Sequence, residues 1–217
     1  MRLLFYWRIL LPYKIRVDIE ARLRYNQIIE EYYEDQQKEW KQLSAHLPAQ
    51  VTNTLDIGCG IGGINEFLYK HYSASRSVDV FLLDRNYTAE RVFYGFHQDA
   101  AAYNSLSASK SYLVGRGVPK EAIQIIDVDR DALPPDISFD VILSLFSWGF
   151  HYPIQTYLEY VKGHLARNGT LIVDCRKGTD GIKILRRHFV VSVIDDRPNS
   201  TRVKCQHLAE GVSSRMQ

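Results

Sequence analysis

The chain has 217 residues, of which 46% are hydrophobic and 24% are charged, the ordinary balance of a globular protein. Its 27 basic and 25 acidic residues leave a net charge of +2, which gives no support to a nucleic-acid binder that relies on bulk positive charge. This length is sufficient to bury one sizeable core. A single principal domain is therefore expected, and a nucleic-acid partner is not.

Three cysteines, Cys59, Cys175 and Cys205, form no CxxC pair and have no histidine at a spacing suited to zinc. No metal site is predicted. An odd number of scattered cysteines is typical of free thiols, so a reducing compartment and a cytoplasmic location are expected.

The first 25 residues are rich in aromatic side chains and hold six basic and two acidic residues. Their apolar run, residues 3–11, is interrupted by Arg8 and falls short of the roughly 20 apolar residues that a membrane-spanning helix needs. A basic, aromatic helix can lie on an anionic membrane surface, so a peripheral contact with the inner face of a membrane is one hypothesis for residues 1–25. Two alternatives stay open: a lid over a ligand pocket, and a helix that pairs two subunits of an oligomer.

The stretch up to about residue 47 contains no glycine and places apolar side chains at near-helical spacing among charged neighbours. These side chains are Ile28, Ile29, Tyr32, Tyr33, Trp40 and Leu43. The pattern predicts one or two amphipathic helices, and Pro48 marks their end. We therefore expect a helical arm over residues 1–50.

From Val51 onward, short apolar runs alternate with stretches of helical periodicity, which is typical of a mostly parallel sheet wrapped by helices. The predicted strands lie near residues 54–57, 78–83, 123–127, 140–145, 170–174, 190–194 and 202–207. The longest connection, residues 86–119, is predicted to hold an insertion and then a helix over residues 100–114. Residues 51–217 are thus expected to form one α/β domain with helices on both faces of the sheet.

A glycine-rich turn follows the first predicted strand, where Asp56-Ile57-Gly58-Cys59-Gly60-Ile61-Gly62-Gly63 opens into an apolar, helical stretch. Glycines at this position let the backbone approach a ligand closely. Gly58, Gly60 and Gly63 also satisfy the GxGxxG pattern of dinucleotide-binding folds, in which a helix N-terminus holds a pyrophosphate. Alone, this pattern leaves open whether the ligand is a dinucleotide.

Two acidic residues narrow the choice of ligand. Asp56 lies immediately before the turn, where its carboxylate would repel a pyrophosphate but suits a cofactor that carries an ammonium and a sulfonium. S-adenosyl-L-methionine is such a cofactor, and it is the predicted one. Asp84 ends the second predicted strand, where a carboxylate can bind the ribose diol of either cofactor.

Over residues 51–205 the chain resembles the class I S-adenosylmethionine-dependent methyltransferases, most closely in the glycine turn. The Phe139-Asp140 pair at the fourth strand and Gly169 before the fifth also match that family. The resemblance implies a Rossmann-like sheet of seven strands that ends in an antiparallel hairpin. It also implies transfer of a methyl group and frequent use of the N-terminal arm as a lid.

The resemblance further implies roles for individual residues. The acid and glycines of the first turn are expected to line the methionine half of the cofactor, and Asp84 its ribose. An acid after the third strand approaches the adenine amine in that family, and either Asp127 or Asp129 matches it, with Asp127 preferred. The predicted cofactor site consists of Asp56, Gly58, Cys59, Gly60, Asp84, Arg85, Asp127, Val128 and Ser144.

The segment after the fourth predicted strand, residues 144–153, lies at the carboxyl edge of the sheet, where open α/β folds bind ligands. Small-molecule methyltransferases often carry a histidine here, so His151 is predicted to be the general base that takes a proton from an acceptor hydroxyl. The alternative is that His151 caps a helix that begins near Pro153. Trp148, Phe150 and Tyr152 are predicted to wall the acceptor pocket, with positions in the core as the alternative.

The inserted stretch, residues 87–99, supplies further polar and aromatic groups. Long connections at the carboxyl edge of such a sheet often shape the substrate site. Tyr94 and His97 are therefore predicted to contact the acceptor, with an ordinary surface loop as the alternative.

The segment after the fourth strand also indicates the kind of acceptor. No Asn-Pro-Pro-Tyr-like tetrapeptide is present there, which disfavours methylation of amino groups in nucleobases or glutamine. The residues around His151 resemble bacterial methyltransferases from surface-polysaccharide and secondary-metabolite clusters, so a small-molecule hydroxyl is expected, on a sugar or a lipid-linked glycan. The alternatives are methyl transfer to a protein, lipid or nucleic acid, a nicotinamide-dependent oxidoreductase, and a non-catalytic subunit.

Overall fold

The computed structural model describes residues 25–86 and 104–208. The chain divides into two compact units, residues 1–41 and 42–217, so the boundary predicted near residue 50 falls inside the second unit. The basic segment 1–24 and the predicted acceptor contacts Tyr94 and His97 lie outside the described residues. In the described part of the chain, no helix is both long enough and apolar enough to cross a membrane.

Nineteen residues of the N-terminal arm form helix α3 (Tyr25–Leu43), in agreement with their apolar periodicity. The 3-10 helix η1 (Ser44–His46) follows, and Leu47 returns the chain to an extended conformation. The carbonyl oxygen of Pro48 accepts a hydrogen bond of 2.6 Å from Tyr72 Oη. This bond fixes the chain where it approaches the first strand.

Seven strands form one sheet in the order β3-β2-β1-β4-β5-β7-β6. They are β1 (Asn53–Ile57), β2 (Asp79–Asp84), β3 (Ile123–Asp127), β4 (Phe139–Ser144), β5 (Leu165–Arg176), β6 (Phe189–Asp196) and β7 (Ser200–His207). The first five strands run parallel to one another, whereas β7 runs antiparallel to both β5 and β6. All seven predicted strands are present, and the Rossmann-like α/β fold with a final antiparallel hairpin is confirmed.

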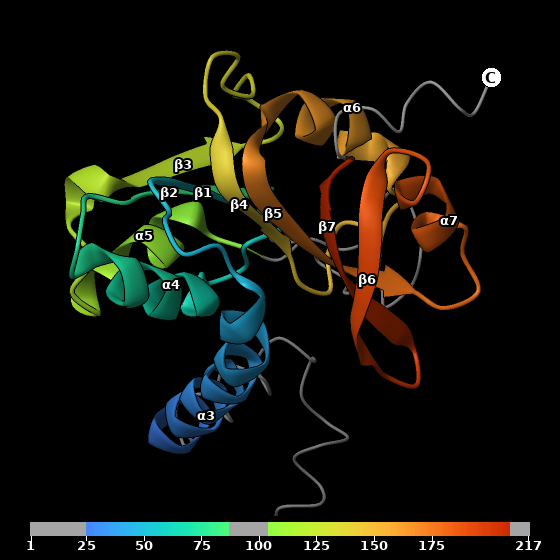
Figure 1. Cartoon of the computed structure of the whole chain (residues 1–217). Coiled ribbons are helices and arrows are strands. Elements are labelled where there is room, and N and C mark those ends of the chain that lie inside the picture. The colour runs from blue at the N-terminus through green and yellow to red at the C-terminus, as the bar shows by residue number, and fades with distance from the viewer. Residues whose placement is uncertain (1–24, 87–103, 209–217) are drawn as a thin grey trace, which may run out of the picture. The chain divides into compact units, whose positions relative to one another are not determined.

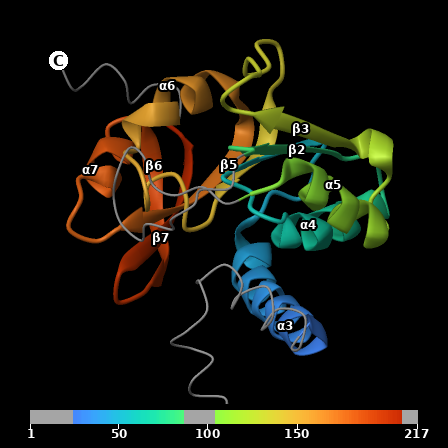
Figure 2. The ribbon, with the colours of Figure 1, turned by 180° about the vertical axis from the view of Figure 1, so that it is seen from behind.

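Helices cover both faces of this sheet (Figure 1). α4 (Gly63–Ser73) and α5 (Leu106–Gly115) lie on one face, beside β1 to β3. α6 (Gln155–His164) and α7 (Gly181–Leu185) lie on the other, and the short 3-10 helix η2 (Lys120–Ala122) leads into β3. The view from behind shows the same layers (Figure 2).

Two helices begin where the sequence supplies a start. Ser105 Oγ accepts a hydrogen bond from the Ala108 N–H, so α5 begins at Leu106 and not near residue 100 as predicted. Gly62, with a φ of +83°, precedes α4. α4 buries Ile64, Leu68 and Tyr72, which follow one another at intervals of four residues.

The hydrophobicity of each strand follows from its place in the sheet. β1 lies between β2 and β4 in a sheet whose two faces carry helices (Figure 1), and four of its five residues are buried, the polar Thr54 and Asp56 among them. Phe81 and Phe139 meet edge to face with ring centres 5.3 Å apart in this core. β6 is an edge strand and leaves Val190 55% exposed. The central strands therefore give a rigid base for the loops at their carboxyl ends.

Successive strands are added to the sheet in one direction from β1 to β3 and in the opposite direction from β4 onward. β1 continues on one side to β2 and β3, and on the other side to β4 and β5. Asp56 is in register with Leu143, and Asp84 is in register with Asp127, so the carboxyl ends of four parallel strands lie at one edge. Open α/β folds bind ligands at such a switch point.

Candidate cofactor and acceptor site

The glycine turn after β1 is held close to its neighbours. The N–H of Gly58 donates to the Leu83 carbonyl oxygen at 2.7 Å. Gly58 has a φ of +77°, and a Cβ built on it would lie 1.7 Å from Ser147 Oγ. A side chain at this position would collide with the segment after β4, so the turn requires glycine here.

Gly60 differs from Gly58 in its surroundings. Its φ is also positive, at +53°, but no atom of the described residues lies within 4 Å of a Cβ built on it. Ser109 Oγ of α5 donates to the Gly60 carbonyl oxygen at 2.7 Å and holds the turn in place. The turn is therefore fixed on one side and open on the other, where a ligand can approach its backbone.

The structure brings Asp84, the last residue of β2, to this turn. Its Oδ2 accepts hydrogen bonds from the Gly60 N–H at 2.8 Å and from Asn104 Nδ2 at 3.0 Å. Burial raises the pKa of Asp84, while these hydrogen bonds and the charge of Arg85 act in the opposite direction. Asn104 is not among the predicted residues, because only the fold brings it back to the end of β2.

Asp56, the acid before the turn, is only 3% exposed. Asn65 of α4 donates from Nδ2 to Asp56 Oδ2 at 2.6 Å, while Asn65 Oδ1 has no hydrogen-bond partner among the described residues. Burial raises the pKa of Asp56 to about 7, and the charge of Asp84 acts in the same direction. The raised pKa means that Asp56 costs the folded protein stability as pH rises from the ordinary carboxyl range to about 7.

These groups fit the cofactor that the sequence predicts. A bound ammonium group would neutralise the ionised carboxylate of Asp56 and could donate to the unpaired amide oxygen of Asn65. A pyrophosphate would instead add negative charge beside a buried acid. The open side of Gly60 leaves room for a ligand at the same turn.

The third part of the predicted cofactor site lies at the end of β3. Asp127 is buried, and its Oδ1 accepts a hydrogen bond from the Asp129 N–H at 3.1 Å. The Asp129 carboxylate forms an ion pair with Arg85 at 3.1 Å. The Val128 N–H donates to the Asp84 carbonyl oxygen at 3.1 Å, so it is not available to donate a hydrogen bond to a ligand. Asp127 therefore stays the preferred candidate for the adenine amine.

Ser144, a predicted cofactor residue, uses its side chain within the fold. Its side chain is fully buried, and its Oγ donates to the Ile57 carbonyl oxygen at 2.8 Å. The same Oγ accepts the Trp148 N–H at 2.8 Å. Ser144 thus joins the ends of β4 and β1 and positions the glycine turn.

Trp148 is also fully buried, in agreement with the alternative of a core position and not with a place in the wall of the acceptor pocket. Its Nε1 donates to the Ile154 carbonyl oxygen at 2.8 Å. Its ring meets Tyr157 edge to face at 6.2 Å between centres. With its polar atom satisfied inside the core, Trp148 has a structural role.

His151 lies half-buried in the turn after β4. The N–H groups of Phe150 and His151 both donate to the Ser147 carbonyl oxygen, at 3.0 and 2.8 Å. The His151 ring meets the Phe150 ring edge to face at 5.1 Å. α6 begins only at Gln155, after Ile154, so His151 is not the residue that caps this helix.

Tyr152 lies beside the glycine turn. Its Oη is 3.1 Å from Ser147 Oγ, the atom that a Cβ on Gly58 would meet. Burial raises the pKa of Tyr152 well above its usual value. Its hydroxyl therefore stays protonated and can donate a hydrogen bond to a neighbouring group.

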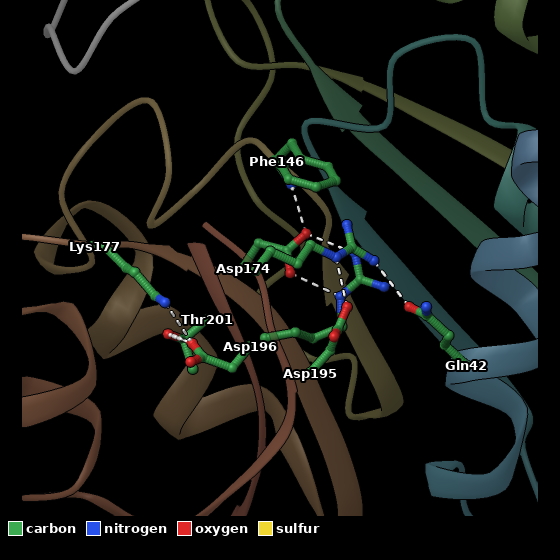
Figure 3. A network of polar contacts seen from close by, with 9 residues as sticks. Gln42, Phe146, Asp174, Lys177, Asp195, Asp196 and Thr201 are labelled. Carbon is green, nitrogen blue, oxygen red and sulfur yellow. Dashed lines mark hydrogen bonds and ion pairs between the residues drawn. The ribbon is translucent and has the colours of Figure 1, made fainter. Parts of the chain in front are cut away.

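A buried ion pair that sequence reasoning missed holds the segment after β4 (Figure 3). Asp174 of β5 and Arg202 of β7 are both fully buried and are joined by two hydrogen bonds of 2.7 Å. Asp174 Oδ2 also accepts the Phe146 N–H at 3.2 Å. Phe146 is the one non-glycine residue in the described ranges with a positive φ, +54°, a conformation that costs about 1–2 kcal/mol. The hydrogen bond from the Phe146 N–H to Asp174 helps to hold this conformation.

Charged residues extend this network toward the surface (Figure 3). Arg197 pairs with Asp195 at 2.5 Å, and its guanidinium carbon lies 5.0 Å from the centre of the Phe146 ring. Lys177 pairs with Asp196 at 2.9 Å. The segment after β4 and the ends of β5, β7 and β6 therefore combine aromatic rings with charged pairs.

No protein-family model matches the sequence, and no curated protein sequence is significantly similar to it. Solved structures share its fold at low identity. Precorrin-6y C5,15-methyltransferase from Geobacter metallireducens gives a TM-score of 0.57 at 11% identity, over 81% of this chain and 88% of that one. The StiE O-MT structure gives a TM-score of 0.57 at 14% identity, over 88% of this chain and 82% of that one. The chain therefore has the fold of class I S-adenosylmethionine-dependent methyltransferases.

Proposed function

We propose that the protein is an S-adenosylmethionine-dependent methyltransferase that acts on a hydroxyl of a small molecule, with a sugar or glycan precursor as the acceptor. The strongest support is the buried acid Asp56 next to a glycine turn that is open at Gly60. Asp84 reaches the same turn, and the fold is one that methyltransferases share. The same buried acid disfavours a dinucleotide.

The residues of three strand ends would hold S-adenosyl-L-methionine. Asp56 and Asn65 would bind its ammonium group. Asp84 would bind its ribose, and Asp127 its adenine amine. When bound, the cofactor supplies a methyl carbon made electrophilic by a positively charged sulfur.

Displacement at an activated methyl carbon needs alignment above all, so the chain has to hold the acceptor oxygen in place. His151 is the residue suited to take the proton of an acceptor hydroxyl, because histidine is a base that works near neutral pH. Phe150 and Tyr152 would contact the acceptor beside it. Tyr94 and His97 stay proposed contacts from outside the described residues.

Replacing His151 with alanine is expected to lower kcat/KM for a hydroxyl acceptor by about 100-fold or more, because the acceptor proton loses its base. Transfer of an isotopically labelled methyl group to a panel of sugars measures this rate over a range of pH. In the wild type the rate should rise with pH, as expected for a reaction that needs a general base. In His151→Ala that rise should disappear.

His71→Ala is the matched control, because His71 is an exposed histidine in the last turn of α4, far along the chain from the segment after β4. Both variants should bind S-adenosylhomocysteine like the wild type. Rates for His151→Ala that equal those of the wild type at every pH would exclude His151 as the base. Methylation of amines but of no hydroxyl would overturn the proposed acceptor class.

A further inference from the structure

Arg176 is the last residue of β5 and lies against the segment after β4. Its N–H donates to the Gly149 carbonyl oxygen at 2.9 Å, and Gly149 directly precedes Phe150. The same segment reaches the glycine turn, since a Cβ on Gly58 would meet Ser147. Arg176 therefore lies at the edge of the sheet that carries the proposed acceptor groups.

The guanidinium of Arg176 covers an aromatic ring. Its carbon lies 5.1 Å from the centre of the Phe150 ring. That ring in turn meets Phe146 at 5.4 Å and His151 at 5.1 Å, both edge to face. A guanidinium carries five N–H donors in a planar fork, and two of them can bind a carboxylate or a phosphate together.

The neighbouring cations at this edge already have carboxylate partners. The pairs are Arg202 with Asp174, Arg197 with Asp195, and Lys177 with Asp196. For Arg176, no carboxylate of residues 25–86 or 104–208 comes within ion-pair distance. Its half-buried guanidinium is thus a positive charge that the described residues do not neutralise, close to the proposed base.

We infer that Arg176 binds an anionic group of the methyl acceptor, a carboxylate or a phosphate, and so selects acidic sugars over neutral ones. The inference rests on the proposed function, because it concerns the acceptor of the same site. Arg176 and His151 contact the same Phe150 ring. An acceptor whose anionic group is held by Arg176 is therefore kept beside the proposed base.

Three sugars that differ at one position test this selection: D-glucuronate, D-glucose 6-phosphate and D-glucose. Each is titrated calorimetrically into the full chain in the presence of S-adenosylhomocysteine. The wild type should bind one of the two anionic sugars about tenfold more tightly than glucose, and the tighter of the two identifies the anion as carboxylate or phosphate. Arg176→Gln should remove the difference. Lys177→Gln, which changes a neighbouring cation that is already paired, should retain it.

Equal affinity for the three sugars, binding of none of them, or a preference that survives in Arg176→Gln overturns the inference. A separate titration distinguishes this failure from failure of the proposed function. Arg176→Gln should bind S-adenosylhomocysteine like the wild type, because Arg176 is not among the cofactor residues. If the wild type itself does not bind S-adenosylhomocysteine, the proposed function fails, whatever the sugars show.

Discussion

Gly58→Ala is expected to lower the free energy of unfolding by about 2–4 kcal/mol and to weaken binding of S-adenosylhomocysteine by about 100-fold or more. The new Cβ would lie 1.7 Å from Ser147 Oγ and 2.3 Å from Ser147 Cβ, and rotation of the serine cannot move its Cβ away. The alanine would also have to adopt a φ of +77°. Because Ser147 belongs to the segment that carries His151, the clash displaces both the turn and the proposed base. Urea unfolding and calorimetric titration measure the two effects.

Comparison with Gly60→Ala separates the two costs of an alanine at Gly58, the positive φ and the clash with Ser147. A Cβ on Gly60 meets no atom of the described residues within 4 Å, so its cost in stability should be only about 1–2 kcal/mol. Binding of S-adenosylhomocysteine should still fall, because the added methyl group projects into the open side of the turn. Ser147→Gly, added to Gly58→Ala, should restore the part of the stability that the clash removes, while the cost of the positive φ stays. Wild-type stability and affinity in Gly58→Ala would show that Ser147 does not constrain the turn.

Asp174→Asn is expected to destabilise the protein by about 3–5 kcal/mol, because it removes the carboxylate charge that faces the buried guanidinium of Arg202. Both side chains are fully buried, and the two hydrogen bonds between them are 2.7 Å long. The carboxylate also accepts the Phe146 N–H, so the segment after β4 should become more mobile. The midpoint of urea unfolding measures the loss of stability, and methyl transfer measures its effect on the site.

Lys177→Ala is the matched control for this prediction. Lys177 pairs with Asp196 at 2.9 Å, but both side chains are well exposed, so its loss should leave the midpoint of unfolding close to that of the wild type. Replacing both buried partners, in Asp174→Leu with Arg202→Met, should cost less than Asp174→Asn alone. A midpoint for Asp174→Asn close to that of the wild type would mean that the buried pair contributes little.

The strand pattern could be predicted because the central strands are covered on both faces. β2 and β4 are therefore mainly apolar runs, and the glycine turn follows the buried strand β1. Side-chain direction in the segment after β4 could not be predicted, because no regular alternation governs an irregular loop. The hydrogen bonds of Ser144, the last residue of β4, and of Trp148 in this segment, to Ile57 and Ile154 respectively, place both side chains in the core.

The buried pair and the asparagines of the site depend on contacts between distant segments. Asp174 and Arg202 are 28 residues apart, and only the register of β5 with β7 brings them together. One signal is present in the sequence, since an acid within the apolar run of β5 needs a buried partner. No pattern in the sequence marks Asn104 as a partner of Asp84. The chain brings Asn104 back to the end of β2 only in the folded protein, just before α5 begins.

The most direct test of an S-adenosylmethionine site at the glycine turn is a calorimetric titration of the wild-type chain with S-adenosylhomocysteine at about pH 6 and about pH 8, with NAD as the competing ligand. Binding should be about tenfold tighter at the higher pH, because Asp56, with a pKa of about 7, is then ionised and neutralises the ammonium of the ligand. Asp56→Asn should remove this pH dependence, Asp84→Ala should abolish binding, and NAD should give no heat. Binding of NAD without S-adenosylhomocysteine, or affinity for S-adenosylhomocysteine that falls as pH rises, would contradict the assignment of Asp56 to a cationic cofactor.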